Sequence, residues 1–525
     1  MHARSHFMRV ATAVCIVHSC ASLHASGSNQ PADQREVLDI GGRRQVFIDG
    51  RFLADARNVH LVMHPPVKTG EYAIRPDQPW ERGIGCYNSA LWADGTYHMW
   101  YRAGAGMCYA RSKDGIHWEK PKLGLAEVDG SKNNNIVLGH GAGGADDAGQ
   151  GGMVFEDPTA AADQRFRMAI RENDPGNDVR LYSSPDGIHW KLTHPGVLTF
   201  TEPDKRHHLD SQNVIFWDDR ISKYVAYMRR NLYQEGSQGR AIARSESATL
   251  DGFLRAQEAP VVIGPDEQDP RLGDYRVLDY YTSAAIKYPW AQDAYYMFPT
   301  AYFHYVPGEL SEFPERAPIN AGPLDTRFAA GRDGIHWQRF DRVPFVRLGV
   351  KGAFDDKCAR VFYGLVPSVD GREMYMYYLG TDQLHGWGRD NSDNSELLTR
   401  AGLHPAQRVT IISRLVLRRD GFVSVRAAYT GGEFTAGPLT FQGRELTLNL
   451  DTSAAGLLQC EIQDIDGRPI PGYRLADCDR IHTCNEMNRV VKWKGKSDVS
   501  PQAGRPVRLR FVYRDADLYA FQFRP

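Results

Sequence analysis

Four carboxylates recur at a similar place in the sequence, about 14 to 20 residues ahead of tyrosine-rich segments: Glu81, Asp210, Asp279 and Asp355. Carboxylates that converge on one pocket repel one another, and this repulsion separates their pKa values. Hydrolysis of a glycosidic bond uses such a separation, because one carboxyl group acts as a protonated acid while another is an ionised base or nucleophile. The pattern favours these four residues as catalytic candidates, with Glu81 or Asp210 as the acid. Capping of strands or pairing with arginine is the structural alternative for each.

A second set of polar and aromatic side chains lies beside the same segments. Guanidinium groups in this set could bind sugar hydroxyls or an anionic group, and a tyrosine could contact a sugar ring. A purely structural role with satisfied hydrogen bonds is the alternative for each. The candidates for substrate binding are Asp49, Arg102, Gln212, Arg229, Tyr281, His304 and His385.

A short repeat indicates which elements must position these residues. Residues 112–118 read Ser-Lys-Asp-Gly-Ile-His-Trp, and close copies occupy 184–190 and 331–337. Residues 245–253 and 419–422 hold weaker copies. Asp-Gly suits a tight hairpin, because both residues tolerate positive φ. The spacing of the copies fits four-stranded blades with long loops, and helical periodicity is scarce.

The repeats therefore predict an all-β fold, a five-bladed β-propeller over residues 36–425. The innermost strands of a propeller surround a central channel, so residues that precede these strands meet at one mouth of the channel. After residue 425, alternation of apolar and polar residues between glycine and proline turns predicts a β-sandwich over residues 426–525.

The first 25 residues are typical of a signal peptide. Arg4 and Arg9 precede an apolar run, and small residues follow at cleavage spacing. We expect an exported protein, periplasmic or extracellular, with a lipid anchor at Cys20 as the alternative. No other apolar run is long enough to span a bilayer. Disulfides are permitted in that compartment, and Cys86 with Cys108 or Cys478 with Cys484 could pair.

Charge and motifs exclude several classes of function. The formal net charge of −1 leaves no electrostatic footprint for nucleic acid. The sequence holds no P-loop, no His-Glu-x-x-His and no Gly-x-Ser-x-Gly. We expect no cofactor; a structural calcium ion at Asp146 and Asp147 is the alternative, because aspartate oxygens suit that ion. The oligomeric state is left open.

The Ser-x-Asp-Gly-Ile-His-Trp repeats resemble those of five-bladed propeller glycoside hydrolases of the family 32 and family 43 type. The stretch Gly-Ser-Lys-Asn-Asn-Asn-Ile-Val at 130–137 is similar to a group of exported bacterial proteins related to family 32. This resemblance implies a carbohydrate substrate and an acidic central pocket. The Trp-x-Asn-Asp-Pro-Asn, Arg-Asp-Pro and Glu-Cys motifs of fructosidases are absent from the sequence, so fructan specificity does not follow.

The leading prediction is an exported glycoside hydrolase. One alternative is a propeller that binds glycan without cleaving it, and another is an interaction scaffold in which the carboxylates are structural. A glycoside phosphorylase is the remaining alternative, which a basic phosphate site at Arg229 and Arg230 would favour.

Overall fold

A computed structural model describes residues 36–104, 106–139, 152–171, 178–199, 209–232, 239–272, 275–276, 278–291, 293–304, 321–386 and 409–525. The expected signal peptide lies outside these ranges, and so do Asp146 and Asp147, the alternative calcium site. The described residues form strands with four short 3-10 turns: η2 (Gly50–Phe52), η3 (Ala162–Gln164), η4 (Leu475–Asp477) and η5 (Ser500–Gln502). None of their helices is long and apolar enough to cross a membrane.

Three four-stranded antiparallel sheets follow one another along the chain, each with its strands paired in sequence order. This hairpin-by-hairpin order is that of propeller blades. The first sheet contains β6 (Ser89–Ala93), β7 (Thr96–Ala103), β8 (Gly106–Ser112) and β9 (Ile136–Leu138). The second contains β10 (Gly152–Glu156), β11 (Phe166–Arg171), β12 (Val179–Ser184) and β13 (Lys191–Leu198). The third contains β14 (Val214–Asp218), β15 (Lys223–Asn231), β16 (Arg240–Ser247) and β17 (Val261–Ile263).

The fourth unit has the same order, but three of its strands are interrupted. The interrupted strands are β20 (Leu278–Tyr280) with β21 (Ile286–Lys287), β22 (Tyr295–Met297) with β23 (Thr300–Phe303), and β24 (Leu324–Thr326) with β25 (Ala329–Gly331). The outer strand is β26 (Gln338–Arg339), and a small hairpin of β18 (Arg271–Leu272) and β19 (Tyr275–Arg276) precedes the unit. Inner halves pair with inner halves and outer with outer, so each half keeps the blade order.

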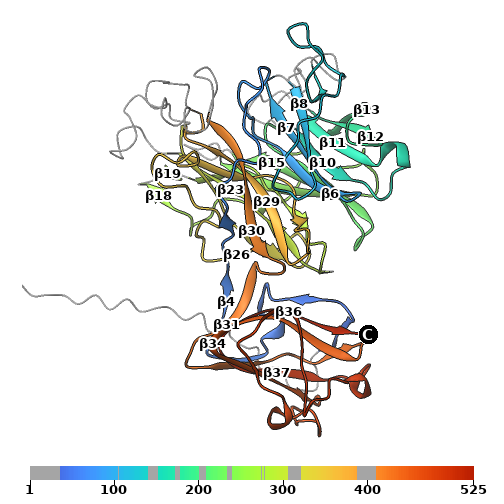
Figure 1. Cartoon of the computed structure of the whole chain (residues 1–525), viewed down its shortest axis with the longest axis vertical. Helices are drawn as coiled ribbons and strands as arrows, with labels where there is room; N and C mark the ends of the chain where they lie inside the picture. Colours follow the sequence, from blue (N-terminus) through green and yellow to red (C-terminus); the bar gives the residue numbers. More distant parts are fainter. Residues whose placement is uncertain are drawn as a thin grey trace, which may run out of the picture. The chain divides into compact units, whose positions relative to one another are not determined.

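The fifth unit uses strands from both ends of the chain. Its own strands are β27 (Cys358–Val361), β28 (Val366–Pro367), β29 (Glu373–Thr381) and β30 (Thr410–Arg418). The outermost strand is β5 (Val67–Lys68), which pairs antiparallel with β30. Figure 1 shows β29 beside β30, as their nine paired residues require. The prediction of an all-β propeller is confirmed, and its last unit is completed by a strand from the N-terminal part.

The predicted Asp-Gly turns have the same geometry in all three clear copies. In the first, one oxygen of Asp114 accepts hydrogen bonds from the backbone of Ile116 and His117, both at 2.8 Å. Each turn glycine has a φ of +72° to +75°, which a side chain at Cβ would strain. The turn alone therefore accounts for the Asp and Gly of this repeat.

The turns also link neighbouring blades. In each, the carbonyl oxygen of the glycine accepts a hydrogen bond of 2.7 Å from an aromatic side chain of the adjacent blade. The pairs are Tyr377 with Gly115, Trp100 with Gly187 and Tyr227 with Gly334. The repeat thus orients blade against blade, and so fixes the strands that carry the candidate site.

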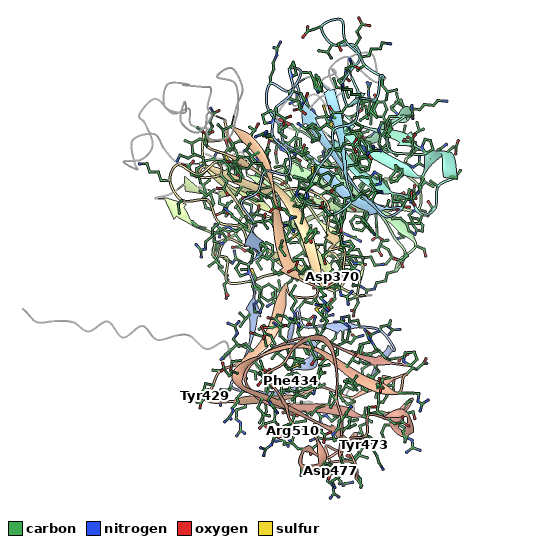
Figure 2. All side chains as sticks on the ribbon, viewed as in Figure 1. Asp370, Tyr429, Phe434, Tyr473, Asp477 and Arg510 are labelled. Atoms are coloured by element: carbon green, nitrogen blue, oxygen red, sulfur yellow. The ribbon has the colours of Figure 1, made fainter. Side chains whose placement is uncertain are left out.

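Two long strands dominate the C-terminal sheet, β34 (Glu445–Gln463) and β37 (Arg508–Arg524), which pair along most of their length. Phe434 on β32 and Arg510 on β37 are labelled there in Figure 2. The other strands of this part are β31 (Val423–Ala427), β32 (Gly432–Thr435), β33 (Leu439–Phe441), β35 (Ile481–His482) and β36 (Asn485–Val490).

The N-terminal segment joins this C-terminal part, although we predicted that the propeller begins at residue 36. Its strands are β1 (Leu38–Gly41), β2 (Gln45–Val46), β3 (Asp55–Arg57) and β4 (Val59–Met63). They pair with β33, β37, β32 and β31 respectively, and Figure 1 shows β4 beside β31. Alternation along one strand shows which of its faces is buried but not which sheet it joins. The six cysteines of the described part are all free thiols.

Candidate functional site

A cavity of the described part lies where the first and fifth blades meet. Its volume is about 870 Å³. The wall comes from the loop before β6, from the end of β7, from Arg360 on β27 and from the segment after β29 that carries His385. These are the starts of innermost strands and the ends of second strands, so the cavity lies at the edge of the blades where we expected the site.

Two buried tyrosines join the first and fourth blades beside this cavity. The phenol of Tyr87 donates a hydrogen bond of 2.6 Å to the phenol oxygen of Tyr281. Tyr87 has a φ of +69°, an unusual backbone conformation for a bulky residue and one that often marks functional sites. Burial, followed by the neighbouring carboxylate of Asp210, raises the pKa of Tyr281, and burial holds the pKa of Tyr87 well above its usual range. Both phenols therefore keep their protons at neutral pH.

Asp210 lies next to this pair, as its effect on the pKa values of both tyrosines requires. Its backbone carbonyl accepts a hydrogen bond of 2.7 Å from Arg229. Its carboxylate oxygen Oδ1 is buried and has no hydrogen-bond partner among the described residues. A buried polar atom without a partner costs about 1 to 3 kcal/mol, so such atoms are rare outside functional sites.

Asp279 on β20 has the opposite surroundings, because its carboxylate is fully paired. Only 1% of the residue is exposed. Oδ2 lies 2.6 Å from Nη1 of Arg240 and 2.9 Å from Nε2 of His304. Burial alone would raise the pKa of Asp279, but the bond to His304 and the charge of Arg240 outweigh it, and the pKa falls below its ordinary value. Asp279 is therefore ionised at neutral pH.

Three buried arginines surround Tyr281. The guanidinium carbons of Arg229 and Arg240 lie 5.9 Å and 5.3 Å from the centre of its ring. Arg360 donates from Nη1 to the sulfur of Cys86 at 2.7 Å. Arg229 is a residue predicted from the sequence, whereas Arg240 and Arg360 were not predicted. The signal for Arg360 is a single charge in the otherwise apolar innermost strand Cys-Ala-Arg-Val.

His385 and His304 complete the aromatic part of the site. The His385 ring packs against Tyr281 and Tyr302, with centroids 5.2 Å and 5.0 Å apart. Burial, and then the charge of Arg360, holds the pKa of His385 well below its usual range, so this ring is neutral. The structure brings both predicted histidines to the same cluster as Asp279.

Arg102 belongs to the wall of the cavity, and Glu81 supports this wall from behind. Arg102 lines it, as do Trp80 and Arg82 on either side of Glu81. The Glu81 carboxylate is buried behind them, 2.6 Å from the Tyr101 hydroxyl and 2.7 Å from the Lys120 ammonium. Burial raises the pKa of Glu81 despite Lys120. Its contacts fix the wall loop, and Trp80 offers an aromatic face of the kind that stacks on sugar rings.

Gln212 connects three blades near the axis. Its amide donates to the backbone carbonyl of Asn88 at 2.5 Å and accepts from the backbone of Tyr363 at 3.2 Å. Both polar ends of the side chain are therefore used within the protein.

The structure places two predicted residues elsewhere. Asp49 caps η2 and pairs with Arg332 at 3.0 Å. Asp355 binds Lys68 at 2.6 Å and the Tyr378 hydroxyl at 2.9 Å. Among the described residues, Arg102 and His385 are the predicted ones that line the cavity; Asp49 and Asp355 do not, and Asp210 and Asp279 belong to the cluster around Tyr281 beside it. Of the four carboxylates, Asp355 has the longest spacing from its tyrosine-rich segment. Its side chain contacts residues of neighbouring blade strands and not the mouth of the channel.

The arrangement thus differs from the acidic pocket that the resemblance implies. Two carboxylates, Asp210 and Asp279, stand among three arginines and several tyrosines. The described residues contain no group of three or more His, Cys, Asp or Glu side chains that could hold a metal ion.

Several solved structures are similar to this chain. A thermostable family-43 glycoside hydrolase shares 14% identity, covers 68% of this chain and 95% of its own, and gives a TM-score of 0.41. The catalytic domain of a Coprinopsis cinerea family-62 α-L-arabinofuranosidase shares 12% identity, with 67% and 96% covered and a TM-score of 0.41. A Bombyx mori family-32 β-fructofuranosidase shares 11% identity, with 91% and 95% covered and a TM-score of 0.38. No family model and no curated protein matches the sequence. With every TM-score below 0.5, we draw no conclusion about activity from this similarity.

Proposed function

We propose that this protein is an exported glycoside hydrolase whose reaction takes place where the propeller blades meet, with Asp210 and Asp279 as the catalytic carboxylates. The observation that carries the proposal is the contrast between the two. One carboxylate has a buried oxygen without a partner, and the other is held ionised by an arginine and a histidine. Glycosidases depend on two carboxylates whose environments keep them in different states.

The roles follow from this contrast. Asp210, with a free oxygen, is the acid that gives its proton to the leaving oxygen as the glycosidic carbon–oxygen bond breaks. Asp279, as the ionised carboxylate, stabilises the positive charge that develops on the sugar and assists the attack on the anomeric carbon. Water supplies the new hydroxyl group, and its proton restores the acid. Because Tyr87 donates its phenol proton to Tyr281, the Tyr281 proton is the one left to hydrogen-bond a sugar oxygen nearby.

The test is a screen of the mature protein against a panel of oligo- and polysaccharides, with released reducing sugar as the readout. Asp210→Asn and Asp279→Asn variants run beside it, with Asp94→Asn as the control. Asp94 is an exposed carboxylate on the first blade, whose ion pair with Arg165 lies at the surface. The proposal expects turnover in the wild type and the control, and a loss of about 10²- to 10⁴-fold in the two site variants. Binding without release in the wild type would favour a glycan-binding protein instead.

The arginine cluster favours one second candidate, a glycoside phosphorylase. In that reaction inorganic phosphate, not water, attacks the anomeric carbon, and Arg229 and Arg360 are the cations placed to hold it beside Asp279. Cleavage that requires phosphate and yields a sugar phosphate would establish this candidate. Cleavage in phosphate-free buffer would exclude it.

A further inference from the structure

The arginines at the centre of the site carry more positive charge than the protein itself neutralises. Arg240 pairs with Asp279. Arg229 and Arg360 form no ion pair with any carboxylate of the described residues, although only 4% and 8% of these residues are exposed. Buried cations are normally paired, so an excess of this kind indicates a missing anionic partner.

The hydrogen-bond inventory points the same way. Arg229 uses Nε on Asn231 at 2.9 Å and Nη1 on the Asp210 carbonyl at 2.7 Å, and its Nη2 is buried without a partner. Arg360 uses Nη1 on Cys86, and its Nε is buried without a partner. Guanidinium groups bind carboxylates and other oxyanions through such N–H groups. Arg229 and Arg360 therefore each have a buried nitrogen donor that forms no hydrogen bond with the described residues.

The two arginines lie near the same pair of side chains, Tyr281 and His385. Both influence Tyr281 and both lower the pKa of His385, whose ring rests on Tyr281 and lines the cavity. Burial, and then the nearby charge of Arg240, lowers the pKa of Arg229, as expected where like charges are gathered. An anion at this point would relieve that repulsion.

We infer that Arg229 and Arg360 bind an anionic substituent of the glycan, a carboxylate or a sulfate ester, so that the substrates of this protein are acidic sugars. The inference rests on the proposed function for the glycan, but it concerns binding and can be tested without turnover. The uncharged His385 and the paired Asp279 add no unpaired charge beside these two guanidinium groups.

The experiment is calorimetric titration of the mature protein with matched acidic and neutral probes. The pairs are digalacturonate with its methyl ester, glucuronate with its methyl ester, and galactose 6-sulfate with galactose. We expect at least one acidic probe to bind about 10- to 100-fold more tightly than its neutral partner, as charge-assisted hydrogen bonds predict. The preference should weaken as salt is raised. The pair that responds identifies carboxylate or sulfate as the source of the charge.

Variants assign the effect to the two arginines. Arg229→Gln and Arg360→Gln should each remove most of the preference for the acidic probe. Arg230→Gln removes the same charge from the next residue, whose guanidinium binds the Ala259 carbonyl instead, and should leave the preference intact. Thermal unfolding checks that each variant is folded; if a glutamine variant does not fold, the methionine variant at that position, which also removes the charge, takes its place.

The outcomes separate the two proposals. Equal binding of acidic and neutral probes throughout would overturn this inference, whatever glycan the protein cleaves. Tighter binding of inorganic phosphate than of every acidic sugar, through the same arginines, would also overturn this inference. Acidic probes that bind without any glycan being cleaved would support the inference and refute the hydrolase.

Discussion

The carboxylate of Asp279 and the imidazole Nε2 of His304 lie 2.9 Å apart, and Arg240 reaches the same oxygen from the neighbouring blade at 2.6 Å. Three strands of two blades are thus tied together by one buried anion. The contacts that keep Asp279 ionised also link the two blades. The contribution of this link to stability can be measured separately from catalysis.

The first prediction concerns the pH dependence of stability. The folded-state pKa of Asp279 is below its ordinary value of 3.8, so its contribution to stability is present above about pH 4 and is lost as pH falls through the folded-state pKa. Asp279→Asn should lower the free energy of unfolding by about 3 kcal/mol at pH 7, because Arg240 is left buried without its partner. The difference from the wild type should shrink as pH falls below 3.8 and through the folded-state pKa. Urea unfolding at several pH values checks this; a difference independent of pH would contradict it.

The link between the fifth and first blades gives a second prediction. Tyr377→Phe removes the hydrogen bond to the Gly115 carbonyl and leaves that buried oxygen without its donor. The free energy of unfolding should fall by about 1 to 3 kcal/mol. Tyr429→Phe is the matched control, because Tyr429 is 65% exposed in the C-terminal part (Figure 2) and should change stability by less than about 0.5 kcal/mol. Equal effects of the two substitutions in chemical unfolding would show that the link contributes nothing.

Gly364 gives a third prediction. Its φ is +135°, and a Cβ atom there would lie 2.2 Å from the carbonyl oxygen of Ala90 on the first blade. Gly364→Ala should therefore destabilise the protein by at least about 2 kcal/mol, since both the backbone conformation and the close approach exclude a side chain. Gly437→Ala, at a position with open space around it, is the control. A thermal midpoint for Gly364→Ala that matches the control would rule out this close approach.

Glu81 gives a fourth prediction, which separates support from catalysis. Its carboxylate holds the wall loop through Tyr101 and Lys120, and it does not line the cavity. Glu81→Gln should lower stability by about 1 to 3 kcal/mol and raise KM by weakening the wall, with kcat changed by less than about tenfold. Kinetics on the glycan that the screen identifies would measure both constants. A fall in kcat of a thousandfold with KM unchanged would return Glu81 to the catalytic role that its position in the sequence suggested.

The blades could be predicted from the sequence because their signals are local. An Asp-Gly turn needs only neighbouring residues, and the same hydrogen bonds form in each clear copy. The sequence does not predict that β5 completes the fifth blade, or that the N-terminal strands join the C-terminal sheet. The partner strands lie more than 300 residues away along the chain. Nothing in their own residues distinguishes one partner from another.

The site could be predicted only in part, for a related reason. Spacing selected Asp210 and Asp279, and both lie in the cluster around Tyr281, although neither lines the cavity among the described residues. The same spacing selected Glu81, whose side chain turns behind the wall, and Asp355, which pairs with Lys68. Side-chain direction depends on the path of the loop, which spacing does not report. Arg240 and Arg360 act through neighbours from other blades, so only the folded chain brings them together.

The most direct test of the central claim compares leaving groups on Asp210→Asn. Aryl glycosides of the sugar found in the screen, with dinitrophenol or phenol as leaving group, differ in their need for a proton. If Asp210 is the acid, the variant should lose about 10²- to 10⁴-fold in kcat/KM with the phenyl glycoside and nearly nothing with the dinitrophenyl glycoside. Equal losses with both, or no loss with either in a folded variant, would contradict the assignment of Asp210 and with it the proposed mechanism.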